Sequence, residues 1–283
     1  MPVLNLPDAD LYYELHESPV VGVSDVSANR PALMLIAGLA SDSQSWLPTV
    51  VQTLSQDRAV VVLDNRGSGR TEYQGEISIP QMASDCMALA DHLNLGSVDL
   101  LGHSMGGMIA LTAARDFSDR INRLVLCNSS AKQNARNRRL FDDWASTYAI
   151  EGPTEAWYRN LFYWLLTPEF FEHPHAINEL VAMVRAYPHA SSPQAYRAQG
   201  NAIAGFDASD WLGEIHTPTL VLAAKGDLIF PPNDNAAGLS ALANAEVNVF
   251  EGQSHSMPML APALVLESVI PFLSPSVTAK PAQ

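Results

Sequence analysis

Short apolar runs alternate along the chain with longer stretches of helical periodicity, and this alternation restricts the fold more than any other feature of the sequence. Continuous apolar runs of this length suit strands that are buried on both faces of a sheet. Residues 80–95 lie between two such runs and carry apolar side chains at helical spacing. Strands that alternate with helices imply an α/β fold, in which helices flank a mostly parallel sheet with right-handed crossovers. The runs span residues 32–37, 59–63, 98–101, 124–127 and 219–224.

Three parts of the chain depart from this alternation. Residues 11–16 alternate between apolar and polar side chains after a turn-prone segment at residues 7–10, which predicts an antiparallel hairpin. Residues 131–210 contain no strand-like run, hold more than half of the aromatic residues, and carry repeated prolines that would divide them into several short helices. We therefore expect a core of residues 1–130 and 211–273, an inserted helical cap at residues 131–210 and a disordered tail at residues 274–283.

One strand-to-helix corner carries the strongest chemical signal. In residues 98–111 a buried run turns directly into a helical pattern, and Ser104 stands at the corner between Gly102 and Gly106 as a G-x-S-x-G pattern. The small neighbours are a physical requirement, because a nucleophile in so tight a turn has a strained backbone and larger side chains would collide. Unpaired N–H groups at the start of the helix favour a developing oxyanion, so we expect the Met105 N–H to be one donor.

A second oxyanion donor is expected in the loop after an earlier strand. Residues 33–46 have the required form, which is an apolar strand, then Gly38 and a polar turn. We assign this donor to the Leu39 N–H. An ordinary strand-to-helix loop, in which the glycine only relieves strain, is the alternative.

A serine hydroxyl is a weak nucleophile, so it needs a base within hydrogen-bond reach and a third group that orients that base. Asp227 follows the apolar run at residues 219–224, and His255 follows a shorter apolar segment, so both stand where open α/β sheets place their sites. A single Asp after a Gly is usually a turn residue, and a single His is usually structural. The order Ser104, Asp227, His255 favours a catalytic triad, because it is the order of α/β hydrolases and not of chymotrypsin-like or subtilisin-like enzymes.

The chain resembles the α/β-hydrolase-fold esterases and lactonases over nearly everything except the expected cap. The resemblance implies the α/β-hydrolase fold, and it gives Asp64 and Arg66 a scaffold role near the oxyanion loop. Two positions depart from the family pattern: Ala37 stands where family members usually carry His, and Ser254 stands where many carry Gly. The first departure bears on how firmly the oxyanion loop is held. The matching segments are residues 38–46, 64–70, 102–107, 226–232 and 254–255.

These residues predict a serine hydrolase that cleaves a carboxylic ester by two-step acyl transfer through Ser104. The aromatic cap indicates a small to medium, largely apolar substrate, and we expect Trp144, Trp164 and Phe162 to contact it. An enol-lactone hydrolase with the same triad is an alternative. A carbon–carbon bond hydrolase is another, although members of that group typically carry Trp directly after the catalytic His, where this chain has Ser256.

Two further readings differ in kind. The chain could be a ligand-binding receptor that keeps the hydrolase fold with little turnover; catalytic turnover, as opposed to a stoichiometric reaction, would distinguish the two. An acyltransferase would need an acceptor that outcompetes water, and nothing in the sequence shows how water would be excluded.

Charge and composition argue against several other kinds of partner. A formal net charge of -14 argues against nucleic acid and anionic membranes, which repel an acidic surface. The N-terminus lacks the features of a secretory signal and no run of eighteen or more apolar residues occurs, so we expect a cytoplasmic protein without stable membrane association. His173, His175 and His189 lack a nearby carboxylate or thiolate set, so we expect no metal, and the chemistry implies no cofactor. The expected partner is a small-molecule ester or lactone.

Overall fold

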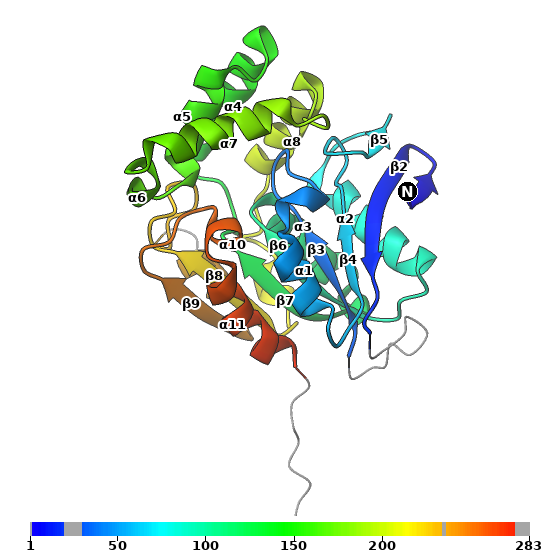
Figure 1. Ribbon diagram of the computed structural model, residues 1–283. Coiled ribbons are helices and arrows are strands. Elements are labelled where there is room, and N and C mark those ends of the chain that lie inside the picture. The colour runs from blue at the N-terminus through cyan, green and yellow to red at the C-terminus, as the bar shows by residue number, and fades with distance from the viewer. Residues whose placement is uncertain (1, 20–29, 234–235, 275–283) are drawn as a thin grey trace, which may run out of the picture.

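The computed structural model describes residues 2–19, 30–233 and 236–274, which form a nine-stranded sheet with helices on both faces (Figure 1). The expected disordered tail lies outside the described residues, apart from Ser274. None of the helices in the described part of the chain is long and apolar enough to cross a membrane. The strands are β1 (Val3–Leu6), β2 (Ala9–His16), β3 (Ala32–Ile36), β4 (Val60–Leu63), β5 (Glu72–Tyr73), β6 (Val98–His103), β7 (Ile121–Cys127), β8 (Thr219–Ala224) and β9 (Ala245–Phe250).

The sheet has the order β1-β2-β4-β3-β6-β7-β8-β9, with β5 paired to β2. The first two strands form the predicted antiparallel hairpin, and β2 also pairs with β4 in antiparallel orientation. From β4 to β9 every neighbouring pair is parallel. The carboxyl ends of β3, β6, β7, β8 and β9 therefore meet at one edge of the sheet, and the expected triad and oxyanion residues each follow one of the ends of β3, β6, β8 and β9.

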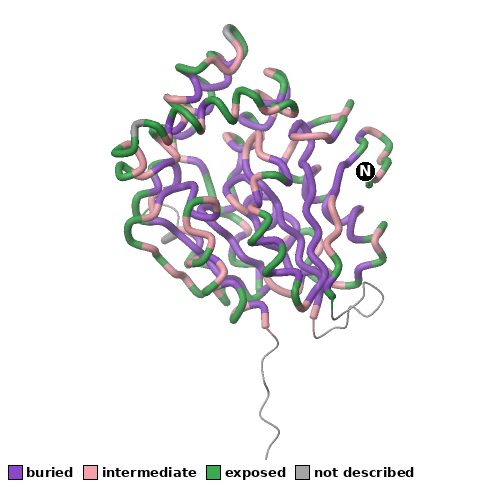
Figure 2. Tube along the Cα trace, viewed as in Figure 1, coloured by how far each residue is buried: buried purple, intermediate pink, exposed green. Residues whose placement is uncertain are grey.

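Alternating side chains of the central strands bury two separate layers of core. In β3, Leu33 and Leu35 belong to the cluster that includes α1 (Pro48–Leu54) and α11 (Pro262–Leu273). Met34 and Ile36 belong to the cluster that includes α2 (Ile79–His92) and α3 (Met105–Asp116). Because successive side chains of a strand point to opposite faces, continuous apolar runs are what a sheet covered on both sides requires. Figure 2 shows the central strands as buried along most of their length.

Five helices lie between β7 and β8 in the chain, and Figure 1 shows them gathered at one end of the sheet. Three of them begin with a proline in the first turn, where the missing N–H breaks no helical hydrogen bond. The division of the chain into a core and a cap at residues 130 and 210 stays a prediction. The five helices, named the helical insertion below, are α4 (Ala135–Glu151), α5 (Glu155–Leu165), α6 (Pro168–Phe171), α7 (Pro174–Ala186) and α8 (Pro193–Ala204).

The helix expected at residues 80–95 ends earlier than its apolar pattern, at His92. Asn94 adopts a left-handed backbone with a φ of 54°, and the N–H of Leu95 closes the helix end by donating to the carbonyl of Ala90 at 2.8 Å. Leu95 is buried outside the helix, which explains why an apolar pattern alone overestimated the helix length. The remaining short elements are η2 (Ser43–Ser45), η3 (Ser118–Arg120), η4 (Leu212–Glu214), α9 (Ala236–Leu239) and α10 (Met257–Leu260).

Candidate active site

Ser104 lies at the corner between β6 and α3 with a strained backbone, at φ 56° and ψ −119°. Its N–H donates to the carbonyl of Cys127 at the end of β7, at 3.0 Å. Its carbonyl accepts hydrogen bonds from the Gly107 N–H at 3.0 Å and from the Ser129 hydroxyl at 2.8 Å. A non-glycine residue keeps such a conformation only where its surroundings fix it, and here three hydrogen bonds to the Ser104 backbone do so.

The glycines beside Ser104 have no room for a side chain. An ideal Cβ on Gly102 would lie 2.2 Å from the carbonyl oxygen of Gly106, and one on Gly106 would lie 2.0 Å from that of Ile36. Both contacts are with backbone atoms, which cannot rotate away. The expectation that small residues are needed at this corner is therefore confirmed in atomic detail.

The first prediction concerns this corner. Gly106→Ala is expected to lower the free energy of unfolding by about 3 kcal/mol or more, because the new methyl group overlaps the end of β3. Gly96→Ala is the matched control, since a Cβ there would meet nothing within 4 Å. Urea unfolding followed by circular dichroism measures both variants. Equal stability of the two would show that the α3 helix can shift away from β3 at little cost.

The structure brings the three predicted residues together as a hydrogen-bonded chain. His255 Nε2 lies 3.1 Å from Ser104 Oγ, and His255 Nδ1 lies 2.8 Å from Asp227 Oδ2. All three residues are buried. Asp227 follows β8 and His255 follows β9, so the parallel sheet places them beside the end of β6.

Asp227 is held as an ionised acceptor. Its Oδ1 accepts the N–H groups of Ile229 and Phe230, each at 2.8 Å, and its Oδ2 accepts from the Asn128 amide at 3.0 Å. Burial alone would raise the pKa of Asp227, but the charge and hydrogen bond of His255, together with the N–H groups of Phe230 and Ile229, outweigh it and lower the pKa. The carboxylate is therefore available to orient the imidazole and to stabilise its charged form.

Asn128 belongs to the site but was not among the predicted residues. Its side chain donates to Asp227 and also to the carbonyl of Ser254 at 3.0 Å, so it links the loops that carry the acid and the base. Its φ of 47° lies in the left-handed region, which asparagine tolerates better than most residues. A signal was present in the sequence, since Asn128 directly follows the apolar run of β7 at the same edge as the triad.

The two expected oxyanion donors lie on either side of Ser104. An ideal Cβ on Gly38 would be 3.1 Å from the Cβ of Ser104, which brings the backbone just before Leu39 against the nucleophile. Met105 is the first residue of α3, and the first N–H groups of a helix have no partner within it. Their role as donors stays a prediction that this placement supports.

The three predicted substrate contacts lie in the helical insertion. Trp144 and Phe162 are buried, and Trp164 is half-buried. The rings of Trp144 and Trp164 meet edge to face with their centroids 6.2 Å apart. Arg136 stacks over Trp164 and donates to the carbonyl of Leu228, in the loop that follows β8. Trp164 is thus linked to a site loop, while substrate contact by all three stays a prediction.

The helical insertion reaches three of the loops that carry the site. α4 contacts the loop after β8, α5 contacts the residue after His255, and α8 contacts the loop after β3. Any movement of these helices would therefore alter the surroundings of the triad. The hydrogen bonds run from Asn137 Nδ2 to Ile229 O at 2.6 Å, from Ser256 N to Leu165 O at 3.1 Å, and from Ala40 N to Gln199 Oε1 at 2.8 Å.

Comparison with known proteins places this geometry in a family. A family model described as alpha/beta hydrolase fold matches residues 31–262. The chain belongs to this family. The α/β-hydrolase fold predicted from the sequence is therefore confirmed, and the protein is a hydrolase by its family. Within the part of the chain that the structure describes, no group of three or more His, Cys, Asp or Glu side chains could hold a metal ion.

Similar proteins cover this α/β hydrolase over almost its whole length. “Putative carbamate hydrolase RutD” of Agrobacterium fabrum is 29% identical over 271 residues, which are 94% of this chain and 99% of that protein. A thermophilic esterase from Thermogutta terrifontis has a TM-score of 0.80 at 24% identity, covering 96% of this chain and 98% of its own. The enol-lactonase of Burkholderia xenovorans LB400 has a TM-score of 0.83 at 24% identity, covering 96% and 99%. These two structures share the fold.

His103 precedes the corner serine of this α/β hydrolase and is held as a neutral ring. Its Nε2 lies 2.9 Å from the carbonyl oxygen of His255, and because a carbonyl only accepts, this nitrogen carries the proton. Burial, together with the charge that His255 can carry 5.1 Å away between ring centroids, lowers the pKa of His103 to about 4. His103 therefore fixes the backbone of His255 without adding charge to the site.

The second prediction follows from this pKa. The unfolded chain binds a proton at His103 below about pH 6.5, but the folded protein does so only below about pH 4, so stability should fall as the pH drops between these values. The shift corresponds to about 3 kcal/mol. Urea denaturation measures the free energy of unfolding at about pH 7 and about pH 4.5. We expect it to fall less between these pH values in His103→Gln than in the wild type. His216→Gln, at an exposed histidine, should keep the wild-type loss, and an unchanged loss in His103→Gln would contradict the prediction.

Proposed function

We propose that this protein is a serine hydrolase that cleaves a small to medium, largely apolar carboxylic ester through an acyl-enzyme on Ser104. The observation that carries the proposal is the continuous hydrogen-bonded chain from Asp227 through His255 to Ser104 at a strained corner of the sheet. A structural histidine does not require a hydroxyl at its second ring nitrogen, whereas a general base must contact the nucleophile, as His255 Nε2 contacts Ser104 Oγ.

The first half-reaction forms the acyl-enzyme. His255 Nε2 accepts the Ser104 proton as Oγ attacks the carbonyl carbon, and Asp227 stabilises the imidazolium that results. The N–H groups of Leu39 and Met105 hold the negative oxygen of the tetrahedral intermediate. When the intermediate collapses, His255 gives its proton to the departing alcohol, and the acyl group stays on Ser104.

The second half-reaction repeats these steps with water. His255 accepts a proton from water, whose oxygen attacks the acyl carbon in the place that the alcohol has left. Collapse of the second tetrahedral intermediate returns the proton to Ser104 Oγ and releases the carboxylic acid. All proton transfers use one imidazole.

The second part of the proposed function is an apolar group attached to the carbonyl that Ser104 attacks. The paired rings of Trp144 and Trp164, with Phe162 in the same helix as the latter, support an apolar substrate near the site. A carbamate is the second candidate, because the relatives that match over nearly the whole chain carry the name “Putative carbamate hydrolase RutD”. The same triad would attack a carbamate carbonyl and form a carbamoyl-enzyme. An enol-lactone would open through the same acyl-enzyme.

Turnover of a substrate panel tests the proposal. Purified protein is incubated with p-nitrophenyl acetate, butyrate and octanoate, with phenyl carbamate and with an enol-lactone, and product is followed beyond one enzyme equivalent. A fluorophosphonate probe and peptide mass spectrometry identify the labelled residue, which we expect to be Ser104. Sustained release from the esters supports the ester proposal, and faster release from phenyl carbamate supports the second candidate. Release limited to one equivalent with every substrate would favour a low-turnover receptor.

A further inference from the structure

A fully buried amide in the helical insertion joins two loops of the core. Gln199 of α8 has no exposed surface. Its Oε1 accepts the Ala40 N–H at 2.8 Å, and its Nε2 donates to the carbonyl of Arg66 at 2.7 Å and to Ser68 Oγ at 2.9 Å. The side chain therefore connects the loop after β3, which carries Leu39, to the loop after β4. Every polar atom of the amide has a partner, so its geometry is fixed.

The loop after β3 depends on contacts from outside itself. Ala37 has no polar side chain, and Ala40 adopts a left-handed backbone at φ 51° without being a glycine. The loop after β4 supplies two anchors, since Asn65 Nδ2 donates to the carbonyl of Ala37 at 3.1 Å and Asp64 Oδ1 accepts the Ser43 N–H at 2.7 Å. These anchors hold the ends of the segment, and Gln199 holds its middle, beside the expected oxyanion donor.

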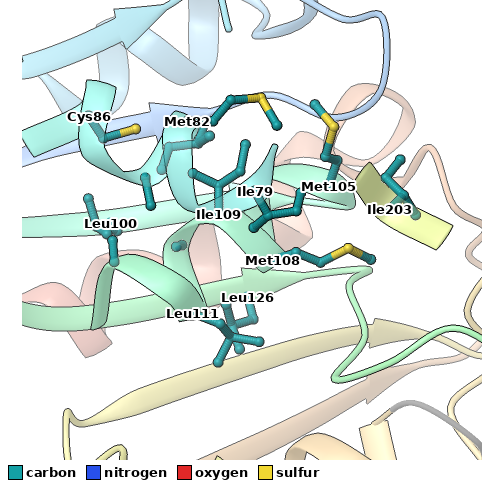
Figure 3. Close-up of a cluster of buried hydrophobic side chains, with 14 of the residues drawn as sticks. Ile79, Met82, Cys86, Leu100, Met105, Met108, Ile109, Leu111, Leu126 and Ile203 are labelled. Carbon is teal, nitrogen blue, oxygen red and sulfur yellow. The ribbon is translucent and has the colours of Figure 1, made fainter. Parts of the chain in front are cut away.

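α8 is also packed closely against the core by apolar contacts. An ideal Cβ on Gly67 would lie 2.9 Å from the Cβ of Ala195 in the first turns of α8, so no larger residue fits there. Ile203, one turn beyond Gln199, belongs to the buried cluster that includes Met105 and Met108 (Figure 3). α8 thus donates and accepts hydrogen bonds at the loops around Leu39, one expected oxyanion donor, and shares an apolar cluster with Met105, the other.

We propose that Gln199 is a positioning residue that holds the oxyanion loop in its active conformation, so that the oxyanion hole is complete only while α8 is docked on the core. The fixed Ala40 N–H defines the peptide plane that follows Leu39 and thereby limits how far the Leu39 N–H can rotate. This inference rests on the proposed serine hydrolase function. It makes the helical insertion part of the catalytic geometry, in addition to any role as a cover.

Three variants separate positioning from simple stability. Gln199→Leu keeps the approximate shape and removes all three hydrogen bonds, whereas Gln199→Glu keeps an acceptor for the Ala40 N–H. Ser191→Ala is the matched control, because Ser191 is buried just before α8 and its Oγ donates to the carbonyl of Gly67 in the loop after β4, at 2.7 Å. This control removes a hydrogen bond to the Gly67 carbonyl, which lies in the loop after β4 and outside the oxyanion loop.

Steady-state kinetics with p-nitrophenyl butyrate and inhibition by phenylboronic acid give the deciding readouts. Phenylboronic acid forms a tetrahedral adduct with an active-site serine, so its inhibition constant reports on the oxyanion hole. For Gln199→Leu we expect kcat to fall about 10- to 100-fold with a nearly unchanged KM, and the inhibition constant to rise by a similar factor. Gln199→Glu should lose less, and Ser191→Ala should keep the wild-type kcat.

Amide hydrogen exchange in residues 38–46 provides a readout that does not need turnover. It should be faster in Gln199→Leu than in Ser191→Ala at equal thermal stability. If Gln199→Leu fails to fold, Gln199→Met, which is unbranched and also removes all three hydrogen bonds, takes its place in this comparison. Equal kcat in Gln199→Leu and the control, or an unchanged inhibition constant, would overturn the inference. Absence of turnover and of fluorophosphonate labelling in the wild-type protein would instead overturn the proposed function.

Discussion

Replacing Ser104 with alanine is expected to lower kcat/KM for p-nitrophenyl butyrate by about ten-thousand-fold or more. The variant keeps the oxyanion donors and the imidazole, but it lacks the oxygen that attacks the carbonyl and lies 3.1 Å from His255 Nε2. Residual hydrolysis would come from water activated by His255 and from the oxyanion hole alone. The rate is measured with enough protein to detect slow release, and product is followed beyond one equivalent.

Stability and labelling serve as controls for this variant. Alanine also has a Cβ, so the backbone strain at φ 56° is the same in the variant and in the wild type. The Ser104 side chain makes no capping hydrogen bond to α3, so the unfolding midpoint should stay close to that of the wild type. Fluorophosphonate labelling should disappear together with activity. A Ser104→Ala protein with more than about a tenth of the wild-type activity would place the nucleophile at another residue and remove the basis of the acyl-enzyme proposal.

The meeting of the three proposed triad residues could be predicted because each of them has a local signal. Ser104, Asp227 and His255 each come directly or shortly after a buried apolar segment, and a parallel sheet brings the carboxyl ends of such segments to one edge. The corner at Ser104 also has its small neighbours on both sides. Local pattern and general sheet geometry together therefore determine which residues meet, although they do not give the distances between them.

Other parts of the site depend on contacts that no local pattern encodes. Gln199 meets the N–H of Ala40 across 159 positions of sequence, and its neighbours in α8 give no indication of a polar partner. The absence of a histidine at Ala37 suggested a less firmly held oxyanion loop, but Asn65 and Gln199 hold it from two sides. Such compensation depends on how the insertion docks, which sequence periodicity does not describe.

For the turn at residues 64–70, the sequence alone could separate a phosphate-binding loop from a structural turn. Its glycines resemble part of a phosphate-binding loop, but the third glycine of the dinucleotide fingerprint and the lysine of a P-loop are absent, which favours the scaffold role that the family resemblance gives Asp64 and Arg66. In the structure both oxygens of Asp64 accept backbone N–H groups, from Ser43 and Arg70, and the Arg66 guanidinium binds the carboxylates of Asp8 and Asp85. The charged groups of this turn are thus used within the fold, consistent with a structural role beside the oxyanion loop.

Asp227→Asn is expected to lower kcat by about ten-thousand-fold, although the two side chains have the same shape. At Oδ1 the residue must offer an oxygen, because the N–H groups of Ile229 and Phe230 both point there at 2.8 Å. The new NH2 group therefore takes the place of Oδ2 and faces His255 Nδ1. That nitrogen must then accept, so the imidazole proton moves to Nε2, which can no longer take the proton of Ser104.

Asn128 adds a cost to the substitution but does not reverse the orientation of the new amide, because one donor at Oδ2 opposes two at Oδ1. Its amide already donates to Oδ2 of Asp227 at 3.0 Å, so an asparagine at 227 would bring two donors together and could not relieve them by flipping against the two N–H groups at Oδ1. Asp99→Asn is the control, because Asp99 is equally buried and pairs with Arg58 at 2.8 Å, away from the triad. We expect that control to lose stability and to keep its kcat with p-nitrophenyl butyrate. If Asp227→Asn stayed within tenfold of the wild-type kcat, the tautomer of His255 would have to be set by a group other than Asp227.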